Sequence, residues 1–251
     1  MEIIIILIVI AIIGYLIHQS LPNTKFLKAE SLIRMKDFIQ AANILNGIID
    51  KHIDAPAKLA ECKLNLGLNS NSNIEKIKYF NEIKKKKKKI NNSKSIAKIE
   101  NFESKALYEI AKIKYEEAKG NVEKIEQNIR FIDAANKNDV ESDFSTLRLK
   151  HFYDLSESYF KNAINIEKTS NLLDAIRLYS IAKDYAEKSN NNSIKSNSIT
   201  RNTICHLKKG DIITLEHITE YEKSDNNYKN ELFYRYTIQL LKNNNYSEAE
   251  K

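Results

Sequence analysis

The apolar and polar positions of this chain never settle into the alternation, bounded by glycine or proline turns, that is typical of a β-strand. Only Pro22, Pro56 and five glycines interrupt its 251 residues, while Leu, Ile, Ala, Lys and Glu are plentiful, so the backbone meets few helix breakers. The pattern therefore predicts an all-α fold built from long helices.

The first segment is apolar on every face. Ile3 to Ile17 contain no charged or strongly polar side chain, and as a helix they extend about 22 Å, somewhat less than the ~30 Å hydrocarbon core of a bilayer. A cleaved signal peptide would need a basic start and a small-residue cleavage site, whereas this chain opens with Met1 and Glu2. A buried core helix is the other alternative, but an amphipathic repeat helix would not be apolar on every face. We expect an uncleaved single-pass transmembrane anchor over residues 1–21.

Flanking charge predicts the orientation of this anchor. No Lys or Arg precedes it, whereas Lys25, Lys28, Arg34 and Lys36 follow it closely, and positively charged loops stay in the cytoplasm. We expect a protein of the cytoplasmic (inner) membrane whose body faces the cytoplasm.

Asparagine marks the turns between the predicted helices, because Asn tolerates the left-handed backbone that ends a helix. Asparagine-rich stretches occupy residues 69–73, 91–93, 190–193, 226–227 and 243–245. An AT-rich genome, which spells polar loops with Asn and Lys, offers a second explanation for the same stretches.

Large and small residues alternate in a recognisable order in the second half of the chain. Small residues let two antiparallel helices approach closely where they cross, and large ones fill the neighbouring grooves. The clearest unit consists of Tyr159, Ala163, Ile166, Leu172, Ala175, Tyr179 and Ala182. This unit resembles the tetratricopeptide repeat (TPR), which implies an α-solenoid of antiparallel helix pairs.

Other parts of the chain follow the TPR order more loosely. Phe233, Tyr236 and Leu240 begin another unit, and Ala29, Leu32, Phe38, Ala41 and Leu45 form one near the start. The pattern degenerates elsewhere, with no Trp and no proline ending a repeat, and residues 142–168 predict one helix longer than a repeat helix. We expect irregular TPR-like hairpins over 22–139 and TPR-like repeats over 140–251, the last one truncated.

The TPR resemblance implies a concave groove that binds a peptide or a helix of a partner protein. Its groove positions fall on Glu157, Phe160, Ile164, Asn197, Thr200, Ile204, Glu231, Tyr234 and Ile238. Five of these are apolar or aromatic, which suits an amphipathic segment. The same side chains could instead be buried against neighbouring repeats.

The excess positive charge of +7 is confined to one stretch. Residues 74–100 contain ten Lys and three Glu, and the rest of the chain is neutral. At its centre lies an unbroken run of six lysines: Lys84, Lys85, Lys86, Lys87, Lys88 and Lys89. Such a run is typical of a solvated helix end, and the functional alternative is anionic lipid headgroups. Nucleic acid is disfavoured, because no aromatic residues interleave with the lysines to stack on bases.

The sequence offers little catalytic or ligand-binding chemistry. The five histidines lack metal-binding spacing, Cys62 and Cys205 belong to no paired motif, and the glycines are too isolated to hold a phosphate. Cys205 and His206 are adjacent, but neighbouring helical residues point about 100° apart. We expect no enzyme activity, no metal and no cofactor.

An anchor followed by cytoplasmic repeats resembles the layout of the bacterial lipopolysaccharide assembly protein B family, without that family's cysteine-rich metal-binding module. The hypothesis is a membrane-anchored scaffold or adaptor that binds partner proteins through TPR-like repeats. A structural subunit packed within a larger membrane complex is the alternative. A third possibility is an enzyme whose catalytic domain lies beyond Lys251.

Overall fold

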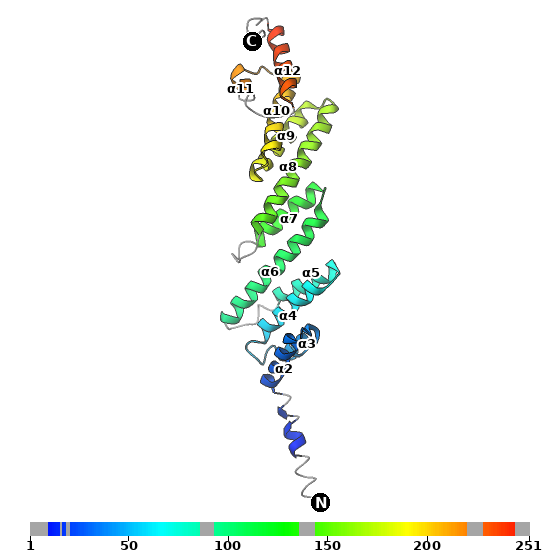
Figure 1. The fold of residues 1–251 in the computed structure, drawn as a ribbon, viewed down its shortest axis with the longest axis vertical. Helices are drawn as coiled ribbons and strands as arrows, with labels where there is room; N and C mark the ends of the chain where they lie inside the picture. Colours follow the sequence, from blue (N-terminus) through cyan, green and yellow to red (C-terminus); the bar gives the residue numbers. More distant parts are fainter. Residues whose placement is uncertain are drawn as a thin grey trace, which may run out of the picture. The chain divides into compact units, whose positions relative to one another are not determined.

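The computed structural model describes residues 10–15, 17–18, 21–85, 93–135, 144–219 and 228–243 (Figure 1). Within these ranges the fold is all-α, without a strand, as predicted. The helices are α2 (Pro22–Arg34), α3 (Phe38–Gly47), α4 (Ala55–Asn69), α5 (Asn73–Lys85), α6 (Ser93–Ala118), α7 (Val122–Ala135), α8 (Phe144–Lys168), α9 (Leu172–Lys188), α10 (Asn192–Lys209), α11 (Leu215–Thr219) and α12 (Lys229–Lys242).

The N-terminal apolar segment is described only in part. Residues 10–15 and 17–18 are helical, and all of them are exposed. The rest of the predicted anchor, residues 1–9, 16 and 19–20, lies outside the described residues. No helix among the described residues combines the length and the apolarity that crossing a membrane requires.

The chain divides into two compact units. The first unit comprises Met1–Lys114 and Phe131–Asp143, and the second comprises Tyr115–Arg130 and Phe144–Lys251. Residues 115–130 thus group with the later part of the chain. The boundary expected between residues 139 and 140 falls among residues that the structure does not describe.

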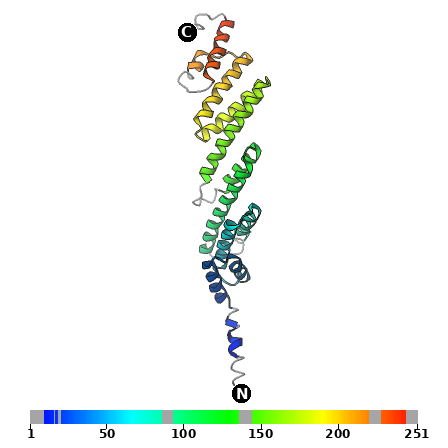
Figure 2. The same ribbon diagram turned by 45° about the vertical axis from the view of Figure 1, so that its right-hand side comes forward.

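In the first unit, neighbouring helices from α2 to α5 pack in sequence order (Figure 2). The core between α2, α3 and α4 contains Phe26, Ala29, Ala41, Ala42, Leu45, Ile48, Ala55, Leu59 and Cys62. A second cluster joins α4 and α5 to α6 and includes Phe80, Ile83 and Ile99. Gly67 of α4 lies against the Phe80 ring, so close that a Cβ there would overlap the ring.

In the second unit, α8, α9 and α10 form consecutive antiparallel hairpins. Ala163 on α8 faces the α9 residues Ala175 and Ala182, and all three are fully buried. These are the small positions at which the sequence predicted the crossing, since alanine lets the helix backbones approach. α12 packs on α10 through Leu232, Tyr236 and Leu240.

Four turns between the described helices share a two-residue design. A residue with positive φ ends one helix, and the next residue, Asp or Asn, caps the following helix with its side chain. The pairs are Lys36–Asp37, Gly120–Asn121, Ser170–Asn171 and Asn190–Asn191. Capping oxygens satisfy amides that the first turn of a helix leaves unpaired. Among the predicted asparagine stretches, residues 190–193 follow this design, with Asn190 in the left-handed conformation and Asn191 as the cap. Asn121 and Asn171, outside those stretches, also serve as caps, and residues 91–92, 226–227 and 244–245 lie outside the described residues.

Candidate functional site

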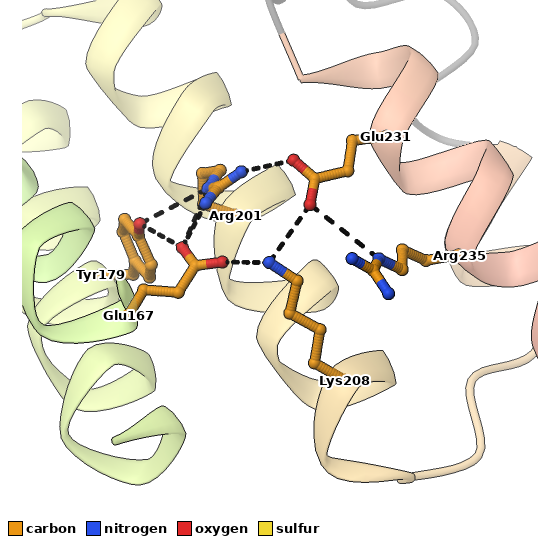
Figure 3. Close-up of polar contacts among 6 residues, drawn as sticks. All are labelled: Glu167, Tyr179, Arg201, Lys208, Glu231 and Arg235. Carbon is orange, nitrogen blue, oxygen red and sulfur yellow. Dashed lines mark hydrogen bonds and ion pairs between the residues drawn. The ribbon is translucent and has the colours of Figure 1, made fainter. Parts of the chain in front are cut away.

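The most buried charged group of the second unit is Glu167, near the end of α8. Its side chain is only 2% exposed, yet it binds two cations of α10. Arg201 donates from Nε to Glu167 Oε2 at 3.0 Å, and Lys208 Nζ lies 2.7 Å from Oε1. Tyr179 of α9 donates its hydroxyl to Oε2 at 2.8 Å (Figure 3). Three helices therefore meet at one carboxylate.

Glu231 extends this cluster to α12. Its carboxylate lies 2.6 Å from Arg201 Nη1 and 3.1 Å from Lys208 Nζ, so both cations of α10 bridge two carboxylates (Figure 3). Arg235 lies one turn further along α12, 3.9 Å from Glu231. The Arg201 guanidinium also lies over the ring of Tyr228. We call Glu167, Tyr179, Arg201, Lys208, Glu231 and Arg235 the ionic cluster.

The ionic cluster has the electrostatics of a structural clamp. Burial alone would raise the pKa of Glu167, but hydrogen bonds from Lys208, Tyr179 and Arg201 outweigh it and hold that pKa below its ordinary value. Burial raises the pKa of Tyr179, and partners raise that of Arg201. None of these three groups exchanges a proton near neutral pH, so they are poorly suited to acid–base catalysis.

The nine predicted groove residues fall into two groups by exposure. Phe160, Asn197, Thr200 and Ile204 are buried, with Phe160 and Ile204 in core clusters. Glu157, Ile164, Glu231, Tyr234 and Ile238 keep accessible surface. Tyr234 is the most exposed at 63%, whereas Glu231 belongs to the ionic cluster. The second group is the part of the predicted groove that remains accessible.

An open groove lies in the first unit, away from those nine residues. It has a volume of about 800 Å³ and is lined by Phe26 and Glu30 of α2, by Ile53 and Asp54, by Ala57, Lys58 and Glu61 of α4, and by Ala97, Lys98, Asn101 and Phe102 of α6. Lys58 spans it, 3.0 Å from Glu61 and 4.0 Å from Glu30. We call it the α2–α4–α6 groove. Its volume is that of a typical ligand pocket, and its lining combines two aromatic rings with charged side chains.

The lysine run is almost entirely undescribed. Lys84 and Lys85 form the last residues of α5, without a description of their side chains, and Lys86–Lys89 lie outside the described residues. The proposal that they bind lipid headgroups therefore stays a prediction.

The titratable residues that could have supported chemistry have other roles. Cys62 and Cys205 are buried free thiols, and burial raises the pKa of each to about 12, which disfavours the reactive thiolate. His151 is fully buried, and its Nε2 lies 2.7 Å from the Asn128 amide nitrogen. Burial lowers the pKa of His151 to about 4. No group of three or more His, Cys, Asp or Glu in the described ranges could hold a metal ion.

The sequence analysis missed the ionic cluster, although the sequence carries a signal for it. Phe160, Ala163 and Glu167 follow one another at helical spacing on the same face of α8, and the first two belong to the core. A carboxylate on an apolar stripe requires a buried cation or hydrogen-bond donor. The cations that bind Glu167 lie 34 and 41 residues away, and the sequence around them gives no comparable signal.

Comparison with known proteins gives no relative for this chain: no protein-family model, no curated protein sequence and no solved structure matches it. The all-α fold is compatible with a helical repeat solenoid. Membership of the TPR family stays a prediction.

Proposed function

We propose that this protein is a membrane-anchored scaffold that binds partner proteins on its TPR-like helical hairpins. The observation that most supports partner binding is the α2–α4–α6 groove, which offers Phe26 and Phe102 to an apolar side chain and both carboxylates and lysines to a polar one. Small apolar grooves with a few charged groups are ordinary docking sites for peptides and helices.

The helical residues 10–15 and 17–18 support the anchor. Ile10, Ile12 and Ile13 are 50–60% exposed, and Tyr15 and Ile17 are 63% and 58% exposed. Apolar side chains on every face of a helix are costly in water and favourable in lipid. A span over residues 3–17 would leave the hairpins on one side of the cytoplasmic membrane. The basic residues that follow the span favour the cytoplasmic side.

Photocrosslinking tests the groove in native membranes. A photoreactive amino acid replaces Asn101, which lines the groove, or Asn81, an exposed residue of α5 outside it. We expect position 101 to capture a discrete partner that position 81 does not. Ala97→Trp, which fills the groove from an exposed position, should abolish that product. Equal products at positions 81 and 101, unaffected by Ala97→Trp, would refute partner binding in the groove.

The accessible groove residues of the second unit have their own test. Tyr234→Asp places a charge in the centre of the exposed face of α12 without disturbing the buried Leu232 and Tyr236. If this face binds a partner, the variant should lose proteins that copurify with the parent chain. An unchanged set of proteins would assign no partner to Tyr234.

A permanent subunit of a larger complex is favoured by exposed apolar side chains outside the groove. Ile74, Leu173 and Ile212 are 66–81% exposed. Dilution separates this alternative from a scaffold: a scaffold should stay in solution and release its partners, whereas a subunit should keep them in fixed stoichiometry or precipitate.

A further inference from the structure

The α2–α3 hairpin carries an unusual mixture of exposed residues immediately after the proposed anchor. Four large apolar side chains, Leu21, Leu27, Met35 and Ile39, are 45–73% exposed. Four cations share this stretch, and all of them are exposed: Lys25, Lys28, Arg34 and Lys36. Single exposed apolar residues are ordinary, but apolar and basic residues together are typical of surfaces that lie in a lipid headgroup layer.

The arrangement around α2 concentrates these residues on one face. Phe26 and Ala29 point into the core, and Leu27, Lys28, Arg34 and Met35 lie on the opposite side of the helix. We call these four residues, together with Lys36 and Ile39, the outer face of the α2–α3 hairpin. Nothing in the core requires leucine or methionine on this side.

The charge of the outer face is not neutralised by its own hairpin. The only acidic residues from 21 to 40 are Glu30 and Asp37. Asp37 accepts the backbone amide of Gln40 as a helix cap, and Glu30 faces Lys58 across the α2–α4–α6 groove. The cations are left to attract an external anionic surface.

The connection to the anchor is short. The Leu21 amide donates to the His18 carbonyl at 3.1 Å, and α2 begins at Pro22. Four residues span at most about 14 Å, and the headgroup layer on each side of a bilayer is about 5–8 Å thick. If residues 3–17 cross the membrane, the first turns of α2 begin at or beside the headgroups.

We propose that the outer face of the α2–α3 hairpin lies on the anionic headgroups of the membrane that holds the anchor. This inference rests on the proposed anchor. Apolar side chains would enter the headgroup boundary, and the cations would snorkel to phosphates. The contact would fix the tilt of the first unit and leave the α2–α4–α6 groove, on the inner side of α2, open to proteins.

The test uses the full chain in vesicles of phosphatidylcholine, alone or mixed with increasing phosphatidylglycerol. An environment-sensitive fluorophore is attached to Met35→Cys or, as a control, to Ile74→Cys on α5; the native cysteines are buried and label poorly. We expect anionic lipid to protect position 35, but not position 74, from aqueous iodide. The equilibrium constant for contact between the outer face and anionic headgroups should fall roughly fivefold for each cation when Lys28 and Arg34 are replaced by Gln. Lys78→Gln and Lys105→Gln should leave this constant unchanged.

Flotation of the same chain with neutral vesicles monitors the anchor separately. Failure to float on any vesicle would overturn the proposed anchor and this inference with it. Flotation with equal iodide access at position 35 in both lipids would overturn this inference alone. Protection that requires added membrane proteins rather than anionic lipid would also overturn it, in favour of an acidic protein partner.

Discussion

Two helix interfaces, one in each unit, bring their helices together with different chemistry. The cluster between α2, α3 and α4 in the first unit is wholly apolar, from Phe26 to Cys62. The interface of α8, α9 and α10 in the second unit also crosses at alanines, but it encloses Glu167 and places Tyr179 and Arg201 beside it.

The two interfaces therefore depend on different interactions. Apolar burial is non-directional and does not change with protonation, whereas a buried carboxylate favours one register in which its partners reach it. A buried ion pair contributes little net stability, but losing one partner is costly. The α8–α10 interface should therefore be the more sensitive of the two to point changes and to acid.

The largest effect is expected from breaking the ionic cluster. Glu167→Gln removes the charge that Arg201 and Lys208 share and should lower the free energy of unfolding of the second unit by about 3 kcal/mol. Glu157→Gln, on the same helix, removes an exposed pair with Lys161 and should cost less than about 0.5 kcal/mol. Hydrogen exchange of the α8–α10 amides measures both, and equal losses would contradict the buried role of Glu167.

The next largest effect is expected from acid, which should destabilise the second unit more than the first. Burial lowers the pKa of His151 from 6.5 to about 4, so between these values the unfolded chain binds a proton that the folded one does not. The contribution of His151 to the free energy of unfolding of the second unit is constant above about pH 6.5. It falls as the pH drops towards 4, by as much as about 3 kcal/mol. The lowered pKa of Glu167 adds a further loss below 4.5.

The control for this acid effect is His151→Gln. Hydrogen exchange at pH 7 and pH 5 should show the second unit loosening and the α2–α4 core unchanged, and the variant should lose most of the difference. A parent protein whose two units lose protection equally between pH 7 and pH 5 would contradict this assignment.

The sequence predicted those features whose cause is local. Asn171 and Asp37 cap α9 and α3, at the turns inside two of the TPR-like units, and α8 is the long helix expected up to Lys168. Ala163 and Ala175 occupy the crossing, because small size alone makes it possible. These features depend on neighbours a few residues away.

The features that the sequence did not predict depend on distant pairs. Arg201 and Glu167 meet only after two hairpins have formed, and the α2–α4–α6 groove depends on how α6 approaches α4. Burial of Thr200 and Ile204 follows from the packing of α10 between its neighbours. The TPR resemblance could not reveal this burial, because helices of unequal length shift which residues face the groove.

A smaller change in stability is expected in the first unit, where a glycine-to-alanine substitution inside a helix should be destabilising. Gly67→Ala in α4 should normally stabilise a helix, but here the new methyl group meets the buried Phe80 ring and should cost about 1–3 kcal/mol. Gly47→Ala at the end of α3 meets nothing within 4 Å. It should be neutral or slightly stabilising in urea unfolding, and the same sign for both variants would contradict the contact.

The smallest effect concerns the turns. Lys36 and Asn190 both have positive φ, at 62° and 57°, but Asn tolerates this conformation better than Lys. Lys36→Gly should therefore stabilise the first unit by up to about 1 kcal/mol, and Asn190→Gly should stabilise the second by less. Thermal unfolding of both variants compares the two turns, and a larger gain at position 190 would argue against this reasoning.

Membrane association of the chain with and without residues 3–17 is the most direct test of the proposed scaffold. Membranes from expressing bacteria are washed with high salt and alkaline carbonate, and the chain is followed in the pellet and the wash. The account predicts that the full chain stays in the pellet until detergent is added and that the shortened chain is released. A full chain that leaves with the salt wash, or a shortened chain that stays, would contradict the anchor.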